Sequence, residues 1–300
     1  MSGCYVDLTR EALIGRVSRA WEALKACRLC ARDCGVDRRG GELGYCRTGL
    51  GAPVASYGPH FGEEAPLRGT HGSGTIFFCG CNLRCVFCQN YDTSHQRVGR
   101  EYGLSELGRM MLALQRRGCH NINLVSPSHV IPQVLGAVAW AARRGLDLPL
   151  VFNTGGYDSA EGLELLDGVV DIYMPDMKYQ DPDVAEALSH ARDYPDVNRR
   201  AVAQMHRQVG DLSLDDRGIA TRGLLVRHLV LPGDLAGTKA LVGLLARDIS
   251  SKTVVNLMDQ YYPAYRAHEH PPLDRRLNRE EFEAALRAAE AAGLERVYRW

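Results

Sequence analysis

Three closely spaced cysteines are the clearest chemical feature of this 300-residue sequence. Cys81, Cys85 and Cys88 form a C-x3-C-x2-C pattern directly after the apolar run GTIFF, which predicts a β-strand. A [4Fe–4S] cluster ordinarily takes four thiolates. Three ligands from one short loop would leave one iron open to a small molecule, as a catalytic metal keeps one coordination position open. We therefore predict an open iron–sulfur site at these three cysteines.

A fourth cysteine lies two residues before this group. Cys79 could complete a closed electron-transfer cluster or a zinc site. However, Cys79 ends the apolar run, where a buried thiol is common. We expect Cys79 to be a strand residue and not a ligand.

A second group of cysteines lies nearer the N-terminus, in a segment rich in glycine and turn residues. Its members are Cys27, Cys30, Cys34 and Cys46. Four soft ligands in a segment without its own core predict a metal-stabilised knuckle. Zinc and an auxiliary [4Fe–4S] cluster both fit, because cysteine thiolates bind either metal. A disulfide is one alternative, and a ligand set that uses only some of the four is another.

The elements that would position these cysteines are predicted from the hydrophobic pattern. Short apolar runs predict strands at Thr75–Cys79, Ile122–Val125, Leu150–Asn153, Val169–Met174, Leu224–Leu231 and Thr253–Met258. Helical patterns occur at Leu8–Leu24, Ser105–Arg117, Ile131–Arg144, Ala160–Leu166, Val197–Val209, Thr238–Ile249 and Arg279–Ala292. Alternating strands and helices predict an α/β fold with a parallel sheet and right-handed crossovers. The pattern fits an open or partly closed barrel, and a doubly wound sheet is the structural alternative.

Composition changes along the chain and predicts two parts. Residues 1–70 hold the first helix and the cysteine-rich metal-binding segment. Residues 71–300 hold the alternating pattern and would form the core barrel.

The charge balance argues against several classes of partner. Lys plus Arg and Asp plus Glu both number 36, so the formal net charge is zero. Such a chain has no overall basic footprint for nucleic acid or anionic membrane. No secretory signal is recognisable, and the most apolar segment is too interrupted to span a bilayer. We expect a cytoplasmic protein without nucleic-acid or membrane partners, whose cysteines are ligands or thiols more often than disulfides.

The loop CNLRCVFCQN resembles the cluster loop of the radical S-adenosylmethionine (SAM) superfamily. Most of the chain resembles one branch of this superfamily, the pyruvate formate-lyase activating enzyme-like proteins. This resemblance rests on the segments CRLCARDC, NINLVSPSHVIPQVL, FNTGGYDS, DIYMPDMKY, RHLVLPG and NLMDQYYPAY.

This resemblance implies a partial (β/α)6 TIM-like barrel with the cluster at the mouth formed by the carboxyl ends of the strands. The open iron of the [4Fe–4S] cluster would hold the amino and carboxylate groups of SAM. Reductive cleavage of SAM would yield a 5′-deoxyadenosyl radical, which abstracts hydrogen from a substrate. Reduced flavodoxin or ferredoxin is the implied electron donor.

Two serines after the second predicted strand are candidates for SAM binding, because catalytic residues of such barrels follow the strands. Ser126 and Ser128 precede a helix that Ser128 can cap, and the free N–H groups there suit a carboxylate. The Gly-Gly-Glu that holds the methionine amino group in the resembling enzymes is missing from this loop. One of the serines would take over that contact, unless Ser128 is a plain helix cap.

The resemblance assigns further residues by position. Asn153, Thr154, Met174 and Asp176 would contact SAM and a monovalent cation, with Lys178 near the carboxylate. Strand alternation places Met174 and Asp176 on one face. A surface ion pair is the alternative for Asp176 and Lys178.

The last two predicted strands add two candidates. Arg227 and His228 are adjacent in an apolar strand, so alternation sends one of them into the barrel, where a charge needs a partner. The resemblance favours Arg227 as the one near SAM. Gln260 shares a face with Asn256 and Met258 and is the other candidate.

We predict a radical SAM oxidoreductase whose substrate is unknown. The target is either a glycyl-radical partner protein or a peptide or small molecule, since both reactions begin with the same radical. The alternative is a non-catalytic iron–sulfur electron-transfer protein, which would need fully ligated clusters and no large α/β cavity. A zinc-stabilised binding protein would leave the polar residues at the strand ends unexplained.

Overall fold

Parallel strands form the centre of the fold and follow one another across the sheet in sequence order. The computed structural model describes residues 2–299. The strands are β2 (Ser73–Phe78), β4 (Ile122–Val125), β5 (Leu150–Thr154), β6 (Ile172–Pro175), β8 (Ala220–Leu229) and β9 (Val254–Met258), each parallel to the next. A doubly wound sheet reverses its order at a switch point, whereas this order never reverses. The sheet stays open between its edge strands, and the predicted partial (β/α)6 TIM-like barrel is confirmed.

Four further strands extend this sheet. β1 (Ala52–His60) pairs antiparallel with β2, and β3 (Arg100–Tyr102) pairs antiparallel with β1. At the other edge β10 (Arg296–Tyr298) is parallel to β9, and the short β7 (Ser213–Leu214) pairs with β8. β1 comes from the segment that we predicted to be rich in loops. The missed strand therefore joins residues 1–70 directly to the barrel sheet.

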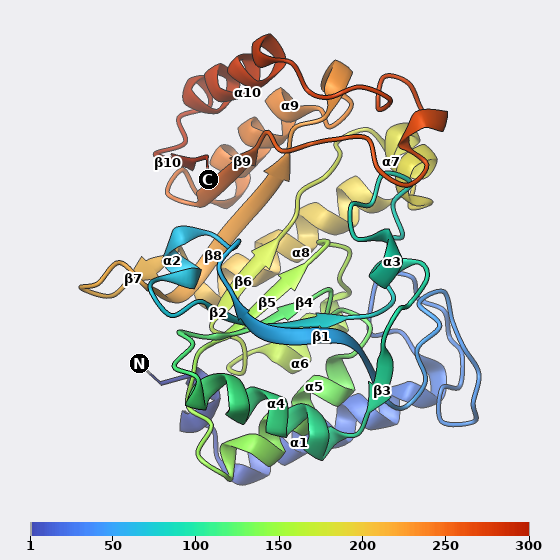
Figure 1. Cartoon of the computed structure of the whole chain (residues 1–300), viewed down its shortest axis with the longest axis vertical. Coiled ribbons are helices and arrows are strands. Elements are labelled where there is room, and N and C mark those ends of the chain that lie inside the picture. The colour runs from blue at the N-terminus through green and yellow to red at the C-terminus, as the bar shows by residue number, and fades with distance from the viewer. Residues whose placement is uncertain (1, 300) are drawn as a thin grey trace.

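Helices cover the outside of the barrel (Figure 1). They are α1 (Arg10–Glu22), α4 (Leu104–Arg116), α5 (Ile131–Ala142), α6 (Ala160–Leu166), α7 (Pro182–Ser189), α8 (Tyr194–Val209), α9 (Thr238–Leu244) and α10 (Arg279–Ala291). Two one-turn helices are placed differently: α2 (Ala65–Arg68) packs at the floor of the barrel, and α3 (Tyr91–Ser94) follows the cysteine loop. The predicted helices all form within a few residues of their expected ends, and α2, α3 and α7 are additions. α7 is easily missed from its short pattern, although Asp181 caps it and Pro182 starts it.

The most apolar segment of the sequence is α5. This helix packs against α1 and α4 and is buried on almost every side, which explains why it lacks a polar face. None of the helices in residues 2–299 is both long and apolar enough to cross a membrane.

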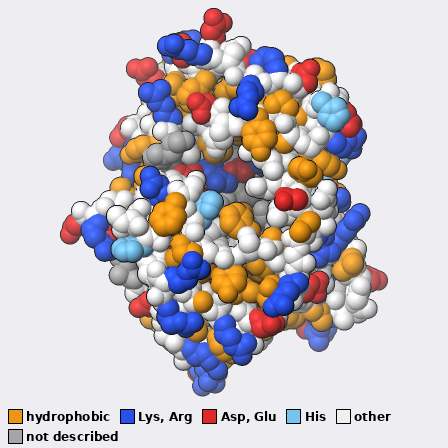
Figure 2. All heavy atoms as spheres, in the orientation of Figure 1, with side chains coloured by type: hydrophobic (Ala, Val, Ile, Leu, Met, Phe, Trp, Pro, Cys, Tyr) orange, Lys and Arg blue, Asp and Glu red, His pale blue; other side chains and the backbone are white. Residues whose placement is uncertain are grey.

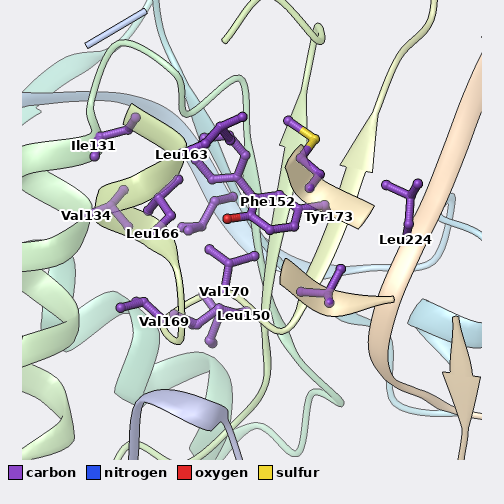
Figure 3. Close-up of a cluster of buried hydrophobic side chains, with 14 of the residues drawn as sticks. Ile131, Val134, Leu150, Phe152, Leu163, Leu166, Val169, Val170, Tyr173 and Leu224 are labelled. Atoms are coloured by element: carbon purple, nitrogen blue, oxygen red, sulfur yellow. The ribbon is translucent and has the colours of Figure 1, made fainter. Parts of the chain in front are cut away.

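The main core fills the space between these helices and the outer faces of the strands (Figure 3). Phe152 and Tyr173 pack edge to face there, with ring centroids 5.9 Å apart, beside Leu163 and Leu166 of α6. Each such buried side chain contributes about 2 kcal/mol of hydrophobic stabilisation. Because strand side chains alternate, the outward Phe152 forces its neighbour Asn153 to face the barrel interior.

The floor of the barrel interior is apolar. Leu67 of α2 packs there with Val151, Ile172, Leu225 and Val254. Two residues further along three of these strands come Asn153, Arg227 and Asn256. The same alternation therefore lifts polar groups above the floor, towards the carboxyl ends of the strands.

Candidate functional site

A cavity of about 270 Å³ lies at the carboxyl ends of the barrel strands. Most of the predicted site residues line it: Cys81, Cys85, Cys88, Ser126, Asn153, Thr154, Asp176, Lys178, Arg227 and Gln260. In Figure 2 this face is hollowed near its centre, and acidic and basic side chains are visible inside the hollow. The loops after β2, β4, β5, β6, β8 and β9 thus converge on one site, as in other barrels of this kind.

The three cysteines of the loop after β2 share one wall of this cavity. The Cys81 sulfur accepts the Leu83 N–H at 3.3 Å. The Ser189 hydroxyl lies 3.0 Å from the Cys85 sulfur, and the Ser94 hydroxyl 3.2 Å from the Cys88 sulfur. These neighbours hold the sulfur atoms in place with polar contacts and leave them on the cavity side.

Burial raises the pKa of the Cys81 thiol and raises that of Cys88 to about 12. Both are therefore neutral thiols when no metal is bound, and a metal must displace their protons. Cysteine sulfur is the ligand that iron–sulfur clusters require. A three-thiol wall beside an open cavity therefore fits a cluster with one iron free of protein ligands.

Cys79 lies on the other side of its loop. Its thiol donates to the Val98 carbonyl at 3.4 Å, and the residue is buried outside the cavity lining. Gly80 turns the chain between Cys79 and Cys81 with a φ of +82°. A Cβ at this position would also lie 2.9 Å from the Cys46 carbonyl, so glycine is required twice over.

A chain of charged and amide groups crosses the cavity opposite the cysteines. Arg227 donates to Asp176 at 3.1 Å and to Asn153 at 2.9 Å, and Lys178 donates to Asp176 at 2.7 Å. Burial alone would raise the pKa of Asp176, but the adjacent Lys178 and Arg227 outweigh it and lower this pKa. Asp176 is therefore an ionised acceptor, and its two oxygens are both engaged by cations.

The alternation argument for β8 holds. Arg227 faces inward, whereas His228 faces outward and contacts the Met177 carbonyl at 2.6 Å and the Thr238 hydroxyl at 2.9 Å. Burial lowers the pKa of His228. This histidine is a neutral packing residue in the outer layer.

Two predicted site residues lie outside the cavity. The Ser128 hydroxyl is buried 2.9 Å from the Thr154 hydroxyl, which in turn donates to Asp158 at 2.7 Å. The prediction that Ser128 caps the helix is wrong, because the N-cap of α5 is Val130 and forms no side-chain cap bond. Met174 is buried in the apolar barrel floor.

The second cysteine group also gathers around one point. Cys27, Cys30, Cys34 and Cys46 line a small pocket that is partly open to solvent, at which Cys34 is exposed. In residues 2–299, no three His, Cys, Asp or Glu side chains are already arranged to hold a metal ion. The same finding covers Cys81, Cys85 and Cys88, so the sulfur atoms of both cysteine groups would have to move on binding a metal.

Arg32 joins this cysteine-rich segment to the cluster loop. Its guanidinium donates to the Asn82 carbonyl at 2.5 Å, the Ser189 carbonyl at 2.8 Å and the Leu83 carbonyl at 3.4 Å, and it also contacts the His190 carbonyl. Tyr45 stacks on the same guanidinium and donates to the Leu83 carbonyl. The loop that presents the three cysteines therefore rests on the N-terminal segment.

Glu63 and Glu64 were not predicted as site residues. They follow β1 and line a second cavity of about 390 Å³, which adjoins the first through Arg227, Met258 and Gln260. Burial raises the pKa of Glu63 to about 7, with repulsion from Glu64 adding to the effect and attraction to Arg227 opposing it. The two adjacent glutamates in the segment GEEAP could have indicated this acidic site, but the segment was predicted to be a loop without a function.

The chain is similar in sequence and in structure to known proteins. Residues 75–213 match the model of the radical SAM superfamily. An uncharacterized protein of Methanocaldococcus jannaschii is 33% identical over 291 residues, which cover 94% of this chain and 80% of that protein. A radical SAM methyltransferase from Sphaerobacter thermophilus is similar in structure with a TM-score of 0.46 and 18% identity. That match covers 75% of this chain and 65% of the methyltransferase chain. The chain therefore contains a radical SAM superfamily domain over residues 75–213, and members of that superfamily use SAM and a [4Fe–4S] cluster.

Proposed function

We propose that Cys81, Cys85 and Cys88 ligate the [4Fe–4S] cluster and that SAM binds in the adjoining 270 Å³ cavity. The observation that supports this most directly is the sorting of the cysteines. Three thiols line the cavity, whereas Cys79 contacts the Val98 carbonyl outside it. A site with three sulfur ligands leaves one iron for SAM.

The polar residues of the cavity suit the charges of SAM. Of the two cations that line the cavity, Lys178 is the one whose charge acts on Cys81 and Cys85, and it would pair with the carboxylate. Asn153 and Ser126 offer neutral hydrogen-bond partners. Asp176 holds Lys178 and Arg227 in fixed positions, because it accepts from both. Gln260 lies on the side of the cavity that adjoins the second cavity.

When bound, the reduced cluster supplies the electron that splits SAM into methionine and a 5′-deoxyadenosyl radical. The chain must then exclude water and position the substrate C–H bond. Leu83 and Phe87 are buried at the cavity and keep its cysteine wall dry. The substrate is a peptide, a small molecule or the glycine of a partner protein, and the electron comes from reduced flavodoxin or ferredoxin.

We further propose that Cys27, Cys30, Cys34 and Cys46 bind one zinc ion, within residues 1–70. Structural zinc sites close on four ligands with no open position, and four thiolates are a common set. These four cysteines supply such a set around one pocket. The metal would stabilise the segment that supports the cluster loop through Arg32.

Low-temperature electron paramagnetic resonance tests the main proposal. The protein is reconstituted anaerobically with iron and sulfide, reduced, and measured with and without SAM. We expect a [4Fe–4S]⁺ signal that changes when SAM is added, because SAM binds the open iron. A signal that ignores SAM would contradict the proposal and favour an electron-transfer protein with four protein ligands.

A further inference from the structure

The second cavity, next to the proposed SAM site, is lined by acidic and amide side chains that SAM binding does not use. It lies beyond Arg227, and Glu63, Glu64 and Asn256 contribute its polar wall. Phe61 and Met258 contribute apolar surface to the same cavity. A ligand here would contact both a polar wall and an apolar one.

Two oxygen atoms in this wall are buried without a partner. Glu64 and Asn256 are each only 4% exposed. The Asn256 amide donates to one Glu64 oxygen at 2.9 Å, but the second Glu64 oxygen and the Asn256 carbonyl oxygen accept nothing. A buried acceptor without a donor costs about 1–3 kcal/mol, so these atoms are suited to a ligand that donates hydrogen bonds.

The cations nearby do not fill this need. Arg227 comes no closer than 3.9 Å to Glu63 and is already engaged by Asp176. Arg68 lines the cavity but forms no ion pair with either glutamate in the described residues. The unpartnered atoms of Glu64 and Asn256 are both acceptors, and the unpartnered donor nearby is the Asn123 amide, beside Glu63.

We propose that this cavity binds a primary alkylammonium group of the substrate, held by Glu63, Glu64 and Asn256; the inference rests on the proposed radical SAM function. An ammonium group donates three hydrogen bonds and accepts none, which matches the two unpartnered oxygens. The positive charge of a bound ammonium group would also lower the raised pKa of Glu63 and favour its carboxylate form. Its alkyl chain would lie along Phe61 and Met258.

This placement orients the substrate for the reaction. Met258 and Gln260 line both cavities, so the carbon chain would extend from the ammonium site towards the SAM site. There one C–H bond breaks, and its hydrogen atom joins the 5′ carbon of the deoxyadenosyl radical. The unpaired electron stays on the substrate carbon, and the ammonium group is unchanged.

Isothermal titration of n-butylamine into the reconstituted protein with SAM present tests this assignment. n-Butanol serves as the neutral ligand of matched length. We expect the amine to bind at least tenfold more tightly than the alcohol. Glu63→Gln and Glu64→Gln should each weaken amine binding at least tenfold, whereas Glu290→Gln, on the exposed face of α10, should leave it unchanged. Equal affinity for amine and alcohol, or unchanged affinity in Glu63→Gln, would overturn the assignment.

A second probe distinguishes the source of the amine. A blocked tripeptide with a central lysine carries the same ammonium group on a peptide. Binding of this peptide in preference to n-butylamine would support the site with a polypeptide substrate, and the reverse order would support it with a free amine. If Glu64→Gln fails to fold, Glu63→Gln decides the outcome, because Glu63 has only the long contact to Arg227 among the described ion pairs.

The same samples separate this inference from the proposed function. SAM cleavage with dithionite as reductant needs the cluster but not the amine site. Intact cleavage without amine binding would reject only the ammonium site. Absence of the SAM-dependent resonance signal in the parent protein would reject the proposed function itself.

Discussion

Arg227 at the inner face of β8 donates a hydrogen bond to Asp176, 3.1 Å away on the loop after β6. This pair ties together two strand ends at the mouth of the barrel. It also joins the two cavities, because Arg227 lines both. Removing the Asp176 carboxylate tests whether these charged hydrogen bonds stabilise the folded protein as well as shape the site.

Asp176→Asn should destabilise the protein by about 3 kcal/mol, because it leaves Arg227 and Lys178 partly buried without their shared carboxylate. Urea unfolding measures this change. Asp183→Asn is the matched control, since Asp183 forms an exposed pair with Arg192 and should matter by less than about 1 kcal/mol. Equal effects of the two substitutions would show that the buried pairing is unimportant.

The three cavity cysteines should differ sharply from the other buried cysteines. Cys85→Ala should lose most of the cluster iron and all SAM cleavage, because two thiols cannot hold the cluster in place. Cys79→Ala and Cys119→Ala should retain both. Iron analysis and the yield of 5′-deoxyadenosine check this. Full cleavage by Cys85→Ala would refute the ligand assignment.

Metal analysis of the protein before reconstitution tests the N-terminal site. We expect about one zinc per chain, lost in Cys30→Ala and retained in Cys119→Ala. About eight irons per reconstituted chain would instead indicate a second cluster.

Arg32→Ala should loosen the cluster loop, because it removes hydrogen bonds to carbonyl groups of residues 82, 83, 189 and 190. Hydrogen exchange of residues 81–90 should become at least tenfold faster, equivalent to about 1.4 kcal/mol of lost protection. Arg28→Ala is the control, since Arg28 forms only an exposed pair with Asp33. Unchanged exchange in Arg32→Ala would mean that the loop is held by other contacts.

Buried His228 predicts acid sensitivity. Burial lowers its pKa in the folded protein, so the unfolded chain takes up the proton first as the pH falls below about 6.5. The free energy of unfolding should therefore decrease below that pH, by at most about 1.4 kcal/mol per pH unit for this group. His228→Gln should reduce the pH dependence of the free energy of unfolding below about pH 6.5, by an amount equivalent to at most one proton. An unaltered slope would assign the acid sensitivity to other groups.

The barrel could be predicted because hydrophobic residues recur with a different spacing in its helices than in its short, apolar strands. Runs such as Ile122–Val125 and Leu150–Asn153 coincide with β4 and β5 almost residue by residue. Alternation also predicted that one of Arg227 and His228 faces inward, and the resemblance selected Arg227. β1 was missed because Pro53, Gly58 and Pro59 interrupt its pattern. β1 is an antiparallel addition near the edge of the sheet, where a strand tolerates prolines.

The site was predictable only where local spacing determines it. The cysteine trio follows from spacing within eight residues, whereas Ser128 was assigned to the wrong side of its loop. Its hydroxyl turns towards Thr154 and Asp158, a tertiary network that the sequence does not reveal. The Glu63 and Glu64 cavity depends on Asn256, 192 positions away from Glu64, and no local pattern predicts such a contact.

The contacts of Arg32 also affect how the protein is made. Arg32 and its partner carbonyl at Ser189 are 157 positions apart, so a ribosome releases the N-terminal cysteines long before the residues on which Arg32 docks. During synthesis Cys27, Cys30 and Cys34 are exposed thiols without a docked neighbour. An early bound metal would shield them from oxidation, and the order of metal loading and barrel completion then becomes a step in the maturation of the protein.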